Sequence, residues 1–207
     1  MKVGNFGRLD PELRRKGIVG LSNGSKLEEV VWNDFNGNWE KLAFESEKLI
    51  ADFQNISIEK ALGFDDFEIP IGKDRIQIIK ARVNQSFFRS LILSSYNQRC
   101  CITNLSIPEL LNASHIIPWS QNKKERLNPR NGLCLNSIHD RAFDKGLITI
   151  TTDYKVLTSR YLRDFDYDRA VVDFFLKYEN HTISLPDRFI PSKEFLEYHA
   201  KNIFLDC

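Results

Sequence analysis

Three stretches between residues 113 and 146 carry the side chains best suited to acid–base and metal chemistry. In chain order they are ASHIIPWS with His115, LNPRNGLCLN with Asn131, and SIHDRAFDKG with His139, Asp140 and Asp144. A neutral imidazole is a suitable general base near neutral pH, and hard divalent cations prefer carboxylate oxygens. A lone histidine in an apolar run is more often a core residue held by a local partner, so its surroundings must decide.

Local patterns place these residues on a strand–loop–strand–helix unit. A first strand is predicted over 110–119, a polar loop over 121–130 and a short second strand over 132–135. A helix over 137–145 follows, and Gly146 is predicted to be its C′ residue.

The order His, Asn, His in such a unit resembles the HNH endonuclease family and its ββα-metal fold. The similarity is clear from about residue 84 to 150, where SHIIPW, NGLCL and IHDRAFDKGLI follow one another. The resemblance implies an α+β fold: a mainly helical N-terminal region, then a ββα-metal (HNH) nuclease core with flanking helices and a hairpin.

The resemblance also implies roles for individual residues. His115 would be the general base, Asn131 would orient it by holding the neighbouring loop, and His139 would bind a metal ion from the helix. Asn131 precedes a glycine, so a plain turn residue is the alternative reading of that position.

Ser114 departs from the common pattern of the family. Many members carry Asp or His just before the general base, where that side chain binds metal, and a neutral hydroxyl is a poorer ligand. Asp140 and Asp144 are four residues apart and hence on one helix face, so Asp144 is the preferred second ligand beside Ser114 and His139. The alternative for Asp144 is a helix-end carboxylate bonded to local backbone or to Arg141. The expected cofactor is Mg²⁺ or Mn²⁺.

The cysteines do not predict a structural zinc site. The residues three positions after Cys100, Cys101 and Cys134 are Thr103, Asn104 and Ser137, so no CxxC pair is complete. Reduced, mostly buried thiols are expected instead.

Basic side chains near the motif predict a DNA partner. The predicted phosphate contacts lie in the loop and on the helix: Lys123, Lys124, Arg126, Arg130, Arg141 and Lys145. A merely solvated loop is the alternative.

The first part of the chain has a different character. The range 27–70 holds 11 acidic and 3 basic residues, whereas 99–146 holds 4 acidic and 7 basic ones. Apolar side chains recur at helical spacing from Val31 to Phe53, interrupted by NGN at 36–38. This stripe could be core or the contact face of a homodimer. The expected domains are a helical accessory region over 1–80, a nuclease core over 81–152 and a C-terminal extension over 153–207.

Other patterns complete the expected secondary structure. A short helix ends near Gly63, RIQIIKARV at 75–83 reads as a strand, and helices are expected over 84–98, 168–180 and 193–204, with a hairpin over 147–159. No apolar run approaches the roughly 18 residues that span a bilayer, and no secretory signal is evident. A cytoplasmic protein without membrane contact is expected.

Together these observations and the resemblance predict a metal-dependent DNA endonuclease. The resemblance further implies a role in restriction or defence. Two alternatives stay open. One is a nucleic-acid-binding module with weak or lost catalysis, suggested by Ser114. The other is a nuclease that acts on RNA.

Overall fold

The structure is a computed structural model that describes residues 6–20, 24–64 and 73–206. Helices and small antiparallel sheets confirm the expected α+β class. The chain divides into two compact units, residues 1–68 and 69–207. The boundary predicted between residues 80 and 81 falls inside a helix, and the three predicted domains stay a prediction.

The described part of the first unit is helical: α1 (Pro11–Arg15), α2 (Lys26–Phe35), α3 (Trp39–Gln54) and α4 (Ile58–Ala61). Ser25 and Glu28 form a capping box at the start of α2, which satisfies backbone N–H groups that the helix leaves unpaired. Between α2 and α3, Gly37 has φ of 81° and Asn38 caps α3. The predicted interruption at NGN is therefore present.

Several large apolar side chains of this unit are exposed rather than packed. Leu27, Val30, Leu49 and Phe53 are 70%, 56%, 66% and 90% exposed. Only Ala43 and Ala51 are buried in α3. Of the stripe that periodicity assigned to a core or to self-association, Leu49 and Phe53 are exposed, whereas Phe35, Trp39 and Leu42 are half-buried.

The second unit begins with the long helix α5 (Lys73–Ser95). The strand predicted over 75–83 is wrong, because this segment is helical and continuous with the predicted helix after it. Phe88 and Ile92 are buried four residues apart, so the helical face that carries them packs on the sheet. Short alternation in RIQIIKARV was outweighed by this longer pattern.

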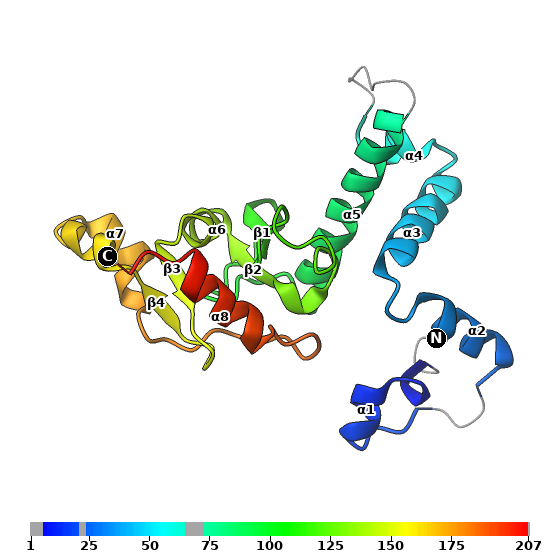
Figure 1. The fold of residues 1–207 in the computed structure, drawn as a ribbon, viewed down its shortest axis with the longest axis horizontal. Coiled ribbons are helices and arrows are strands. Elements are labelled where there is room, and N and C mark those ends of the chain that lie inside the picture. The colour runs from blue at the N-terminus through cyan, green and yellow to red at the C-terminus, as the bar shows by residue number, and fades with distance from the viewer. Residues whose placement is uncertain (1–5, 21–23, 65–72, 207) are drawn as a thin grey trace. The chain divides into compact units, whose positions relative to one another are not determined.

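Two strands and a helix follow in the predicted order: β1 (Leu111–His115), β2 (Gly132–Asn136) and α6 (Ser137–Asp144). β1 ends at His115, four residues before the end predicted at 119. β1 and β2 pair antiparallel, with His115 opposite Gly132 and Leu111 opposite Asn136. Asn136 caps α6 by accepting from the backbone N–H groups of Ile138 and His139. Figure 1 shows this ββα unit with α5 beside it.

The remaining elements of residues 69–207 pack against the ββα unit. β3 (Ile148–Ile150) and β4 (Val156–Thr158) form the predicted hairpin, followed by α7 (Arg169–Phe174) and α8 (Lys193–Asn202). Gly146 ends α6 with φ of 69°, and a Cβ there would lie 2.1 Å from the carbonyl oxygen of Ile203. The glycine is therefore required both by its left-handed backbone and by the close C-terminal segment.

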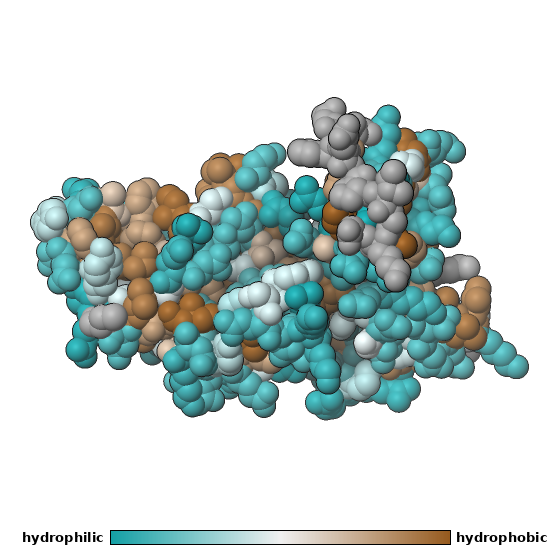
Figure 2. Space-filling view, turned by 45° about the horizontal axis from the view of Figure 1, so that its top comes forward, coloured by the Kyte–Doolittle hydropathy of each residue, from teal (hydrophilic) through white to brown (hydrophobic). Residues whose placement is uncertain are grey.

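The core of this unit gathers apolar side chains from every layer, among them Leu111, Leu133, Phe143, Ile148 and Leu196. On the face drawn in Figure 2, hydrophilic residues predominate and hydrophobic ones form smaller patches between them. Within the described ranges, none of the helices is long and apolar enough to span a bilayer.

Candidate active site

An open pocket of about 600 Å³ lies at the ββα unit. Its walls come from β1, α6, α5 and the residues just after β1. His115, Ser114, Asp140 and Asp144 line it, so residues up to 30 positions apart meet around one space. Polar groups that converge on one pocket are typical of a catalytic or binding site.

His115 is the last residue of β1 and has one committed nitrogen. Its Nε2 lies 2.9 Å from the backbone oxygen of Arg126. A carbonyl oxygen can only accept, so Nε2 carries the proton and donates it. Nδ1 has no hydrogen-bond partner among the described residues, and its lone pair can accept a proton.

Burial sets the protonation of this imidazole. It lowers the pKa of His115 below 6.5, and the charge of Arg126 lowers the pKa further. The backbone bond to Arg126 and the charge of Asp140 act in the opposite direction. The lowered pKa favours the neutral ring, which is the form that a general base needs.

Asn131 holds the loop that carries the oxygen bound by His115. It is 1% exposed. Its Oδ1 accepts from the backbone N–H of Ile117 at 2.8 Å, and its Nδ2 donates to the carbonyl oxygens of Ile117 and Glu125 at 3.2 and 3.1 Å. The amide therefore ties the chain after β1 to the residue preceding Arg126.

The Asp140 carboxylate is held by two side chains of β1. Asn112 Nδ2 donates to Oδ2 at 2.7 Å, and the Ser114 hydroxyl donates to Oδ1. These bonds fix the carboxylate while each oxygen keeps a further lone pair. The Ser114 hydroxyl thus orients the Asp140 carboxylate across the interface between β1 and α6.

Asp144 lies one turn after Asp140 on the same side of α6 and also lines the pocket. Partial burial raises the pKa of Asp144, and the charge of Asp140 raises it further, while Arg141 and Lys145 lower it. Two carboxylates that repel each other in one pocket are the arrangement that a bound cation relieves.

Residues 100–151 match the sequence profile of a family described as HNH endonuclease. This segment of the chain is thus similar to HNH endonuclease domains. The match confirms the family that the His, Asn, His order suggested, and it covers β1, β2, α6 and β3.

One solved structure similar to this chain is described as "Modification dependent TagI restriction endonuclease". The TM-score is 0.42 and the sequence identity 18%, over 56% of this chain and 37% of that one. The present chain therefore matches well under two thirds of that protein's length. Curated protein sequences give no match.

His139, the histidine of α6, does not line the pocket. His139 is 1% exposed, its Nε2 donates to the carbonyl oxygen of Phe174 at 2.6 Å, and its Nδ1 accepts from Asn136 Nδ2 at 2.8 Å. The rings of Phe175 and Tyr178 pack edge-on around it. With both nitrogens committed, His139 has no lone pair for a metal ion, and the structure separates it from His115.

The helical period explains why Asp140 faces the pocket while the adjacent His139 does not. Successive residues of α6 are about 100° apart around the helix axis. His139, Ala142 and Phe143 occupy the buried face, whereas Asp140 and Asp144 lie on the pocket face. Sequence reasoning identified the Asp140–Asp144 face but gave the helix ligand to His139.

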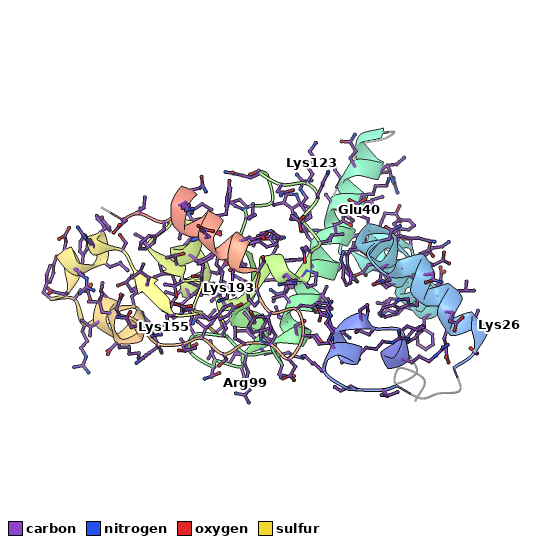
Figure 3. All side chains as sticks on the ribbon, turned by 60° about the horizontal axis from the view of Figure 1, so that its bottom comes forward. Lys26, Glu40, Arg99, Lys123, Lys155 and Lys193 are labelled. Carbon is purple, nitrogen blue, oxygen red and sulfur yellow. The ribbon has the colours of Figure 1, made fainter. Side chains whose placement is uncertain are left out.

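The predicted DNA contacts fall into two groups. Arg141 and Lys145 are exposed and line the pocket. Arg126 is engaged within the chain: Nε donates to the Trp119 carbonyl oxygen at 2.7 Å, and the guanidinium lies over the Trp119 ring. Lys123, Lys124 and Arg130 are exposed, and Figure 3 shows Lys123 at the outer edge of its loop.

Sequence reasoning missed the pocket residues supplied by α5 and Asn112. Gln85, Phe88 and Arg89 line the pocket from α5. Nothing in the local sequence of α5 indicates that contact, since it arises from tertiary packing. Asn112 had a usable signal, because residues i and i+2 of a strand share a face and Asn112 accompanies Ser114.

Proposed function

We propose that this chain is a divalent-metal-dependent HNH endonuclease that hydrolyses DNA phosphodiester bonds, with His115 as the general base. The observation that carries the proposal is the uncommitted Nδ1 of a neutral, fixed imidazole in the same pocket as Asp140 and Asp144. His139 and His199 have both nitrogens bonded, which excludes them from this role in the described arrangement.

The pocket suits a hard cation. Its donors are the carboxylates of Asp140 and Asp144, and among the described residues no group of three or more His, Cys, Asp or Glu could hold a metal ion by itself. Mg²⁺ is commonly bound by one or two carboxylates, with water and substrate oxygens completing its shell. Asp140 and Asp144 would hold the ion, and Ser114 and Asn112 would keep Asp140 in place. The bound cation supplies Lewis-acid stabilisation of charge on the phosphate and the leaving oxygen.

The side chains of the pocket then divide the work of hydrolysis. His115 Nδ1 takes a proton from a water molecule as its oxygen attacks phosphorus, and the bond from phosphorus to the 3′ oxygen breaks. Arg126 O, held through Asn131, keeps the imidazole in the tautomer that can accept this proton. Arg141 and Lys145 neutralise phosphates beside the scissile bond.

Cleavage of supercoiled plasmid tests the proposal. Wild-type protein is expected to cut with Mg²⁺ or Mn²⁺ and to stop with chelator. His115→Ala should lower the rate about 100- to 10,000-fold, the usual contribution of a positioned base. His181→Ala is the matched control, because His181 is exposed and lies outside the pocket. Equal cleavage by His115→Ala would refute the base.

The same assay separates the alternatives. Salt-dependent DNA binding without cleavage under any divalent cation would identify a binding module, and preferential digestion of structured RNA would identify an RNA nuclease.

A biological role in restriction or defence is a further part of the proposal, supported by the resemblance of the HNH segment. Cells that express the protein should restrict incoming phage or plasmid DNA, and cells that express His115→Ala should not. Equal plating efficiencies would contradict this role while leaving the biochemical proposal intact.

A further inference from the structure

The ring of Phe88 stacks on the imidazole of His115. The two ring centroids are 3.8 Å apart, and the planes meet at 12°. Phe88 is 2% exposed, so its ring is fully part of the interior. It comes from α5 and precedes the segment 100–151 that matches the HNH family, so the contact is supplied from outside that segment.

The close approach of α5 depends on Gly132. This glycine pairs with His115 across the two strands. A Cβ at residue 132 would lie 2.3 Å from Ile92 Cδ1 and 2.9 Å from Phe88 Cζ. A bare backbone at this point of β2 therefore makes room for the helix face that bears Phe88.

The other contacts of His115 leave its imidazole plane free to tilt, and Phe88 prevents this tilt. A hydrogen bond from Nε2 to Arg126 O fixes one ring atom, but the ring plane can still tilt about it. Trp119 meets the imidazole edge-on at 5.4 Å and 81°. The parallel face of Phe88 closes the remaining side, so the plane and hence the direction of Nδ1 are defined.

We propose that Phe88 is a positioning residue for His115, which fixes the imidazole plane so that Nδ1 meets the attacking water in the pocket. This inference rests on the proposed role of His115 as the general base. Phe88 lines the pocket, but its ring has no group that could exchange a proton or bind a metal ion, so it acts through the imidazole on which it stacks.

Phe88→Leu tests the inference in the full-length protein, because it keeps an apolar side chain and removes the flat face. Plasmid cleavage with Mg²⁺ is expected to lose about 10- to 100-fold in kcat, the effect of misplacing a reacting group by about 1 Å, with KM changed less than threefold. Ile92→Ala is the matched control. It removes buried volume from the same helix face at Gly132 without a ring contact to His115, so it should lower the melting temperature and leave kcat within about twofold.

A substrate-free measurement keeps the test independent of catalysis. ¹⁵N NMR of the wild-type imidazole should show the Nε2–H tautomer for His115. In Phe88→Leu this tautomer should remain, because the bond to Arg126 O is kept, but the order parameters of the ring C–H groups from ¹³C relaxation should fall, and in Ile92→Ala they should not. The inference is overturned if Phe88→Leu keeps both kcat and the ring order parameters, or if Ile92→Ala loses kcat to the same extent. If His115→Ala cleaves normally, the proposed base fails, and the ring order parameters still report whether Phe88 orders the imidazole.

Discussion

At the residue scale, adjacent positions of α6 have opposite environments. His139 is buried and both of its ring nitrogens are hydrogen-bonded. Asp140 faces the pocket and accepts hydrogen bonds from Asn112 and Ser114. Metal binding is therefore expected to depend on the carboxylates and not on the helix histidine.

Asp140→Asn should weaken Mn²⁺ binding strongly, because it removes a charged oxygen ligand. Asn112→Ala should weaken it about 10- to 100-fold, the usual cost of losing a group that orients a ligand. Titration calorimetry with Mn²⁺ measures both. His139→Gln serves as the comparison, and weaker binding in that variant alone would contradict the assignment.

At the scale of elements, the site exists only because α5 lies against β2. Gly132→Ala is expected to lower the free energy of unfolding by about 1–3 kcal/mol, the usual cost of overpacking. Urea denaturation measures the change. Because the added methyl meets Ile92, the double variant with Ile92→Ala should be less destabilised than the sum of the two single variants. Additive effects would show that the helix contact is not the cause.

The attachment of α8 to the HNH domain depends on a neutral histidine. His199 is 1% exposed, donates from Nε2 to Phe143 O at 3.1 Å and accepts at Nδ1 from the Thr149 hydroxyl at 2.9 Å. Burial lowers its pKa to about 4, although the bond to Phe143 opposes the change.

This pKa predicts a loss of stability in mild acid. As pH falls below 6.5, the unfolded chain takes up a proton at this residue and the folded chain does not until about pH 4. The contribution to the free energy of unfolding should fall by about 3 kcal/mol across this window. Urea denaturation at several pH values should show a shallower slope for His199→Gln than for His181→Gln. Equal slopes of the free energy of unfolding against pH in the two variants would contradict this role of His199.

At the scale of the whole molecule, charge is divided rather than abundant. The net charge is only +1, yet 99–146 carries 7 basic and 4 acidic residues, and four of these line the pocket: Asp140, Arg141, Asp144 and Lys145. DNA affinity should fall with salt through a few local contacts. Substituting Arg141 and Lys145 by alanine should reduce the magnitude of the slope of log K against log salt by about 2. Fluorescence anisotropy at several salt concentrations measures this slope. An unchanged slope would show that Arg141 and Lys145 do not contact phosphates, and Lys123 and Lys124 would be the next candidates.

Self-association through the N-terminal unit stays a prediction. Its apolar side chains Leu27, Leu49 and Phe53 are exposed within the described residues. Light scattering should give twice the protomer mass of 24.1 kDa, and a fully active monomer would contradict the prediction.

The sequence by itself determined the ββα order, the family of the segment 100–151, the general base candidate and the Asp140–Asp144 face. The ββα order and the Asp140–Asp144 face depend on short-range patterns, namely strand period, helix period and turn residues, which one sequence displays. The family and the general-base candidate came from the resemblance of the motif order to the HNH endonucleases. It did not determine the strand-like segment 75–83 correctly, because alternation over a few residues cannot reveal the face of a helix as long as α5.

Only the tertiary structure decided which nitrogens are committed and which are not. Three contacts join residues that lie apart in the chain: the hydrogen bond from His139 to Phe174 O, the hydrogen bond from His115 to Arg126 O, and the stacking of Phe88 on His115. Such contacts arise when elements pack, and each histidine looks alike until its partners are in place. The physical difference between a core histidine and a general base is one unsatisfied nitrogen beside a pocket.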